Sequence, residues 1–130
     1  MNKSLFFEFG EIDVFNNFVI AIMKEGITVK PEYNNDLINI ANKYFPNKPF
    51  GYITYRKNSY SVDPMVYIET SKIKNLVAFA VVSVEGSPGL KLTNVEIEKM
   101  FLKKPFKHFI SLNNAKLWVN EMVEQNKLPY

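Results

Sequence analysis

The chain has 130 residues, of which 47% are hydrophobic and 22% are charged, and its formal net charge is +3. These values are those of one ordinary globular domain that spans residues 1–130, and they exclude a disordered chain or a fibre. Lysines are scattered, with Lys103 and Lys104 the only adjacent lysine pair. The clustered basic stripe typical of nucleic-acid-binding domains is therefore missing.

The chain contains no cysteine and only one histidine, His108. Disulfides and thiol chemistry are excluded, and with a single imidazole we expect neither a transition-metal site nor a metal cofactor. The N-terminus has too few apolar residues before Glu8 to form a signal-peptide core. The longest apolar run, Leu76 to Val82, has seven residues, whereas a membrane span needs about 20. The sequence predicts a cytoplasmic protein that is not an integral membrane protein.

The N-terminal part predicts two or three antiparallel strands. The first is Leu5–Phe9, which Gly10 closes. The next segment is Asp13–Lys24, with a tight turn at Asn16–Asn17. Within it, Phe18–Met23 is too apolar for an exposed strand, so we expect a central one.

Helical periodicity follows, with apolar residues three and four positions apart. Pro31 fits the first turn of this helix and Pro46 ends it. The strand Phe50–Tyr55 comes next. Asp63–Pro64 then predicts the start of a short helix that ends near Ser71, because Asp accepts free N–H groups and proline presets the first turn. The apolar face of the first helix consists of Tyr33, Leu37, Ile40, Ala41, Tyr44 and Phe45.

Leu76–Val84 is almost continuously apolar, which indicates a strand buried on both faces. Thr93–Glu96 has the pattern of a capping box and predicts a helix to about Leu102. The strand Phe106–Ile110 follows, and Ser111 caps a final helix. This order predicts an α/β fold: an N-terminal β-hairpin, then alternating β-α units that form a mostly parallel sheet flanked by helices, with right-handed crossovers. The inner face of the final helix consists of Ala115, Trp118, Val119 and Met122.

Arg56 is the single arginine in the chain, and it comes directly after the predicted strand Phe50–Tyr55. In parallel α/β folds, ligands are bound at the carboxyl ends of the strands. Arginine offers a planar fork of donors that grips a carboxylate or phosphate at two points, which lysine does not. The loop that begins at Arg56 is therefore the predicted functional segment.

Other side chains of this loop could assist Arg56. Lys57 adds charge, and Ser59, Tyr60 and Ser61 offer hydroxyl groups just before a helix N-terminus, which favours anions. The alternative is an ordinary polar connection, in which Arg56 pairs with a surface acid and the carboxylate of Asp63 already occupies the anion position.

No motif for catalysis is present. The five glycines form neither a dinucleotide-binding fingerprint nor a P-loop. His108 is the one candidate base, but no orienting acid or nucleophile is evident, so a structural or surface role is expected. Glu8, Glu11 and Asp13 lie close together and could do acid–base work, but alternating acids beside strands are more typical of a solvent-facing surface. The sequence predicts a protein that is not an enzyme.

The stretch Phe50–Arg56 leading to Tyr60–Pro64, together with Phe106–Phe109 before Ala115–Trp118, resembles the SpoIIAA-like branch of the STAS superfamily. The members of this branch are small bacterial domains related to anti-sigma-factor antagonists. The resemblance covers nearly the whole chain. It implies successive strands side by side with helices packed around them, and a non-enzymatic role in binding a protein partner. In the antagonists a serine at the start of a helix is phosphorylated, and the resemblance makes Ser61 the nearest match and Ser59 the second.

Two hypotheses follow. The first is a non-catalytic bacterial regulatory domain that binds a protein partner through the strand–helix loop 56–64, with Arg56, Lys57, Ser59, Tyr60 and Ser61 as contact residues. The alternative is a small-anion or lipid-binding module of the same fold, since related branches are described as binding lipids or small ligands. Both hypotheses are compatible with a homodimer.

Overall fold

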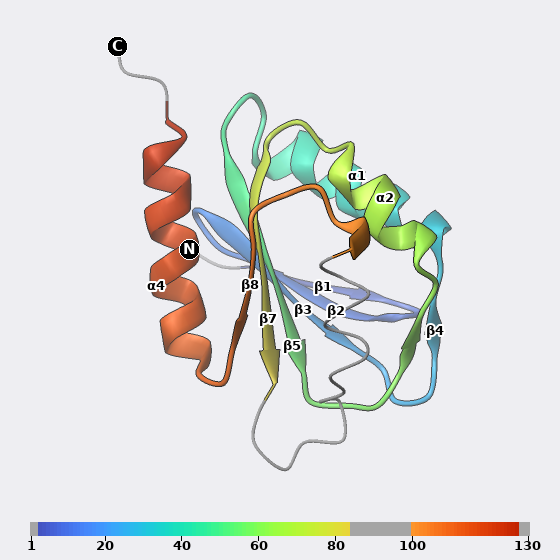
Figure 1. Cartoon of the computed structure of the whole chain (residues 1–130). Helices are drawn as coiled ribbons and strands as arrows, with labels where there is room; N and C mark the ends of the chain where they lie inside the picture. Colours follow the sequence, from blue (N-terminus) through green and yellow to red (C-terminus); the bar gives the residue numbers. More distant parts are fainter. Residues whose placement is uncertain (1–2, 84–99, 128–130) are drawn as a thin grey trace.

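The computed structural model describes residues 3–83 and 100–127 (Figure 1). The predicted capping box at Thr93–Glu96 lies outside the described residues, and so does the predicted loop after the strand that ends near Val84. The predicted strands and helices that lie inside these ranges are all present, with small shifts at their ends.

The described residues form a six-stranded sheet with the strand order β1-β2-β3-β5-β7-β8, and two short strands pair separately. The main strands are β1 (Lys3–Phe7), β2 (Gly10–Val14), β3 (Phe18–Met23), β5 (Phe50–Arg56), β7 (Leu76–Ser83) and β8 (Phe106–Phe109). The short strands are β4 (Thr28–Val29) and β6 (Ser61–Val62). The helical elements are the 3-10 helix η1 (Pro31–Tyr33) and the α-helices α1 (Asn34–Tyr44), α2 (Met65–Ser71) and α4 (Leu112–Gln125).

The sheet begins antiparallel and continues parallel. Strands β1, β2 and β3 form a meander in which Leu5 pairs with Ile12 and Ile12 with Ala21. From β3 onward each strand is parallel to the next, with Ile20 opposite Ile53. The predicted α/β class, with an N-terminal hairpin and a mostly parallel sheet, is therefore confirmed.

Helices cover both faces of the parallel part of the sheet, which is why its strands are apolar on both sides (Figure 1). Helices α1 and α2 lie over one face, here called the front face, and α4 lies over the other, the back face. Along β5, Tyr52 belongs to the front core and Ile53 to the back core. This alternation decides which side chains of the strand ends can reach a site under α1 and α2.

The predicted helix starts are also confirmed. The Asp63 carboxylate accepts a hydrogen bond of 3.0 Å from the backbone N–H of Met65. The Ser111 hydroxyl accepts one of 3.3 Å from the backbone N–H of Asn114. Both side chains satisfy helical N–H groups that have no partner within the helix.

Strands β4 and β6 were not predicted from the sequence, because two residues are too few to show a periodic pattern. They pair in parallel, and the Ser61 N–H donates to the carbonyl of Ile27 at 2.9 Å. The Asp63 N–H donates to the carbonyl of Val29 at 3.0 Å. The segment 57–64, which was expected to be a loop, is therefore hydrogen-bonded to the segment that follows β3.

None of the helices in residues 3–83 and 100–127 has the length and hydropathy needed to cross a bilayer.

Candidate functional site

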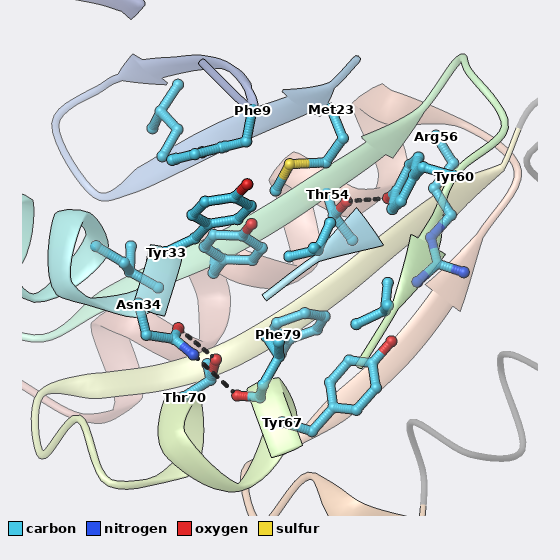
Figure 2. A pocket seen from close by; sticks show the side chains of 16 residues that line it. Phe9, Met23, Tyr33, Asn34, Thr54, Arg56, Tyr60, Tyr67, Thr70 and Phe79 are labelled. Carbon is cyan, nitrogen blue, oxygen red and sulfur yellow. Dashed lines mark hydrogen bonds between the residues drawn. The ribbon is translucent and has the colours of Figure 1, made fainter. Parts of the chain in front are cut away.

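A cavity of about 50 Å³ lies between the front face of the sheet and the helices above it (Figure 2). Strands β2, β3, β5 and β7 form its floor, η1, α1 and α2 form its roof, and β4 and β6 form a side wall. The described residues that line it are Phe9, Ile12, Met23, Val29, Tyr33, Asn34, Leu37, Tyr52, Thr54, Arg56, Tyr60, Val62, Val66, Tyr67, Thr70 and Phe79.

The walls of the cavity are mainly apolar and aromatic. Phe9 stacks on Tyr33 with ring centres 4.6 Å apart, and Tyr52 stacks on Phe79 at 4.9 Å. Stacked rings of this kind hold one another in place, so the walls are preformed rather than loosely packed. An apolar interior also strengthens any electrostatic interaction made inside it.

Two pairs of polar groups join neighbouring elements around the cavity. Thr54 on β5 and Tyr60 share a hydrogen bond of 3.2 Å between their hydroxyl oxygens. On the opposite side, the Thr70 hydroxyl donates to the Asn34 amide oxygen at 2.8 Å, and the Asn34 amide nitrogen donates to the carbonyl of Val66 at 3.1 Å. The second pair ties α1 to α2 and so fixes the roof.

Arg56 ends β5 and turns its side chain into this cavity (Figure 2). It is on the front face because it follows Tyr52 and Thr54 at intervals of two along the strand. The residue is 3% exposed, and its guanidinium carbon lies 5.8 Å from the centre of the Tyr60 ring. The guanidinium of Arg56 is therefore buried at the cavity and does not lie on the exposed surface of the loop.

Arg56 gives the cavity its charge. It is the one side chain with a formal charge among the 16 described lining residues. A guanidinium keeps its proton at any ordinary pH, so Arg56 places a permanent cation beside the cavity. Figure 2 shows its head group directed toward the region where the hydroxyl of Tyr67 lies.

Of the other predicted contact residues, only Tyr60 joins Arg56 in the cavity. Lys57 is exposed, and its ammonium lies 5.6 Å from the ring of Tyr55, which packs against the back core. Ser59 is held by its backbone: its N–H donates to the Glu25 carboxylate at 3.1 Å. Ser61 is exposed on β6. The five residues predicted as one site therefore divide into a buried pair and a surface group.

The other polar lining residues were not predicted from the sequence. Tyr33 was assigned to the apolar face of a helix, Thr54 was only one member of a predicted strand, and Tyr67 was given no role. A signal was present, since tyrosine carries a polar hydroxyl that needs a partner when buried. The hydroxyl of a tyrosine indicates a site only when it is known that tyrosines from separate elements meet. The sequence does not show that they do.

Neither of the other chemical candidates lies in this cavity. Glu11 and Asp13 are two residues apart on β2, and neither lines it, whereas Ile12 between them does. A hydrogen bond with Asp13 raises the pKa of Glu11 above its usual value; desolvation and repulsion from Asp13 add to this, and Lys57 opposes it. His108 lies on β8 opposite Val81. No cluster of three His, Asp or Glu side chains able to hold a metal ion occurs within the described ranges.

Comparison with known proteins leaves the site to be interpreted from its own geometry: no family model, no curated protein and no solved structure matches this chain.

Proposed function

We propose that this protein is a non-catalytic binding module whose cavity under α1 and α2 receives a small anionic ligand with an apolar body. The observation that supports this most is the position of Arg56, a permanent cation that is 3% exposed and borders a mainly aromatic cavity. The apolar walls favour the body of such a ligand and the guanidinium favours its acid group.

The burial of Arg56 strengthens the attraction between its guanidinium and an anion. An anion that enters the cavity brings the opposite charge into a medium where attraction is screened less than in water. Arg56 therefore favours a ligand with an acid group over an apolar ligand of the same size.

The size of the cavity limits the ligand. A volume of about 50 Å³ corresponds to about four water molecules, since each needs roughly 10–15 Å³. A short-chain acid fits this space with little rearrangement, whereas a long lipid chain would need the helices to move apart. Of the two ligand classes that the sequence leaves open, a small anion thus fits this cavity better than a lipid.

A binding role rather than catalysis is supported by the side chains around the cavity. The described lining offers hydroxyl, amide and guanidinium groups, and it contains no histidine, aspartate or glutamate. Proton transfer at neutral pH is usually carried out by one of those three residue types. The resemblance to SpoIIAA-like regulatory domains points to the same kind of role.

The test compares two variants that each remove one positive charge from neighbouring positions. Arg56→Met removes the cation inside the cavity, and Lys57→Met removes an exposed one. Butyrate, benzoate and the neutral butanamide are added at about 10 mM, and the midpoint of thermal unfolding is recorded, because a ligand that binds the native state raises it. We expect the acids to stabilise the wild type and Lys57→Met but not Arg56→Met. Equal shifts in both variants, or a larger shift with butanamide than with butyrate, would contradict the proposal.

A second candidate function is protein binding through the surface part of the same segment. Lys57, Ser61 and Pro64 are exposed, and Met65 beside them is 49% exposed although it is apolar. An apolar side chain among polar neighbours is a common element of a partner surface. Met65→Asp should reduce capture of a partner from native cells and leave the response to butyrate unchanged. Identical sets of captured proteins for the wild type and Met65→Asp would count against this function.

A further inference from the structure

We infer that the outer edge of β1 is a dimer interface, at which β1 pairs in antiparallel orientation with β1 of a second copy of this chain. The inference is independent of the cavity and goes beyond the proposed function. It joins two six-stranded sheets into one continuous sheet across a twofold axis. Twofold symmetry is the commonest symmetry of soluble oligomers.

Backbone groups along the outer edge of β1 point away from the sheet. Strand β1 stands first in the order of the main sheet, and within residues 3–83 and 100–127 it pairs only with β2. Phe7 and Gly10 pair across a two-residue turn, so they exchange backbone hydrogen bonds, and the direction of these bonds alternates along the strand. The N–H and C=O groups of Ser4 and Phe6 therefore face outward. An edge of this kind is a template for another strand.

The side chain of Phe6 makes this edge apolar. Phe6 is 76% exposed, more than any other large hydrophobic residue in the described part of the chain. Leu5 and Phe7 pack against the front core, so Phe6 leaves the sheet on the back face. Native proteins usually protect an edge with charges or proline, and between Lys3 and Glu8 this strand has neither. A partner that covers the edge is therefore expected.

The side chains of β1 match those of a second copy. Antiparallel pairing over the full length of the strand, Lys3–Phe7, puts Leu5 opposite its own copy and Ser4 opposite Phe6. In this register the outward backbone groups of Ser4 meet those of Phe6, so the two residues exchange hydrogen bonds across the axis. The two Phe6 rings become diagonal neighbours on the back face, a separation within reach of aromatic side chains.

The charges at the two ends of the strand favour the antiparallel orientation. Lys3 begins β1 and Glu8 follows its last residue, and both side chains are exposed. Antiparallel pairing places Lys3 of each copy beside Glu8 of the other copy, whereas parallel pairing would align like charges. A second copy thus supplies the hydrogen-bonding groups, the apolar contact and the opposite charges that fit this edge.

The first test measures the dimer dissociation constant of the full chain by analytical ultracentrifugation at concentrations up to about 500 µM. Ser4→Pro removes an outward N–H that makes no bond to β2, a change that edge strands tolerate, and Ser4→Ala is its control. Phe6→Lys puts a charge on the edge, and Leu117→Lys, at a 68% exposed position of α4, is its control. We expect the wild type and both controls to dimerise equally. Ser4→Pro and Phe6→Lys should dimerise at least about 10-fold more weakly, since each change acts twice across the axis.

A charge exchange tests the orientation of the two strands. Lys3→Glu and Glu8→Lys each bring like charges together, and each alone should weaken the dimer about threefold or more. The double variant Lys3→Glu/Glu8→Lys restores opposite charges and should dimerise as the wild type does.

The other outcomes would overturn the inference. A wild type that stays monomeric would exclude the dimer and leave the edge of β1 to a strand of a different protein. A dimer that Ser4→Pro and Phe6→Lys leave unchanged would place the contact on another surface. A double charge variant as weak as the single variants would exclude the antiparallel pairing. If Ser4→Pro unfolds, Phe6→Lys and the charge exchange decide, because both keep every backbone donor of the strand.

Discussion

The hydroxyl oxygens of Thr54 and Tyr60 lie 3.2 Å apart, and their hydrogen bond joins the floor of the cavity to its side wall. The same Tyr60 ring lies 5.8 Å from the guanidinium carbon of Arg56. One side chain therefore holds the wall against β5 and covers the cation that ends the strand. Its two interactions can be separated by substitution.

Tyr60→Phe should lose the hydrogen bond and keep the ring over Arg56, whereas Tyr60→Leu should lose both. We expect Tyr60→Phe to lower the free energy of unfolding by about 0.5–1.5 kcal/mol. Tyr60→Leu should lower it by a further 0.5 kcal/mol or so from the cation–π contact. Urea unfolding measures both values. Tyr44→Phe is the control, since Tyr44 lies on α1 away from the cavity lining. A cost for Tyr60→Phe no larger than that of Tyr44→Phe would show that the hydrogen bond does not stabilise the fold.

The buried hydrogen bond from Thr70 to Asn34 should stabilise the roof of the cavity. Both residues are at most 6% exposed, so Thr70→Val leaves the Asn34 amide oxygen buried without this donor. The expected loss is about 1–3 kcal/mol in the free energy of unfolding. Thr28→Val makes the same change at an exposed position of β4 and should be nearly neutral. Similar losses at the two positions would show that the buried hydrogen bond from Thr70 to Asn34 does not stabilise the fold.

Gly51 allows α4 to approach the back face of β5. A Cβ atom added at this residue would overlap the Cγ1 atom of Val119, which is itself fully buried. Gly51→Ala should therefore destabilise the protein by about 1–3 kcal/mol through overpacking.

The double variant Gly51→Ala/Val119→Ala tests this cause. The methyl group added on the strand then occupies the space vacated on the helix, so the two costs should not add. A double-mutant cycle should give a favourable interaction of about 0.5–3 kcal/mol. Simple additivity of the two single losses would show that steric overlap is not the reason for glycine at this position.

Glu11 should make stability depend on pH. Its pKa is raised mainly by the hydrogen bond with Asp13, so the folded state favours the protonated form. The resulting stability is present below the pKa of the unfolded chain and is lost as the pH rises through the folded-state value. Glu11→Gln mimics the protonated form and should raise the unfolding temperature at pH 7, with the difference from wild type disappearing near about pH 3.

Glu121→Gln removes an exposed carboxylate from α4 and controls for the change in net charge. It should alter the unfolding temperature much less than Glu11→Gln does at neutral pH. A benefit of Glu11→Gln that persists unchanged at low pH would mean that the ionisation of Glu11 is not its source.

Most of the secondary structure could be predicted from local chemistry. Phe18–Met23 and Leu76–Ser83 are apolar on both sides because helices cover both faces of the strands, and that pattern is visible in the sequence. Asp63 and Ser111 mark helix starts because they accept hydrogen bonds from residues only two or three positions away. Strands β4 and β6 escaped prediction because their pairing depends on residues far apart in the chain.

The candidate site was predictable in part. Its central residue, Arg56, was identified from its rarity and its place at the end of a strand. The other residues predicted for the site are neighbours of Arg56 in the sequence. Of these predicted residues, only Tyr60 lines the cavity. Tyr52 and Phe79 meet at the cavity only through the ladder between β5 and β7. A site of this kind is assembled across strands, and sequence proximity is a poor guide to it.

The sequence by itself determined the alternation of strands and helices, the caps, and the location of one arginine at a strand end, because these depend on chemistry within a few residues. The tertiary structure decided that this arginine is buried, because the parity of β5 turns Arg56 to the face covered by α1 and α2. It also decided which polar groups surround the cavity, since Tyr33, Tyr67 and Thr70 come from elements that meet only when the helices pack on the sheet.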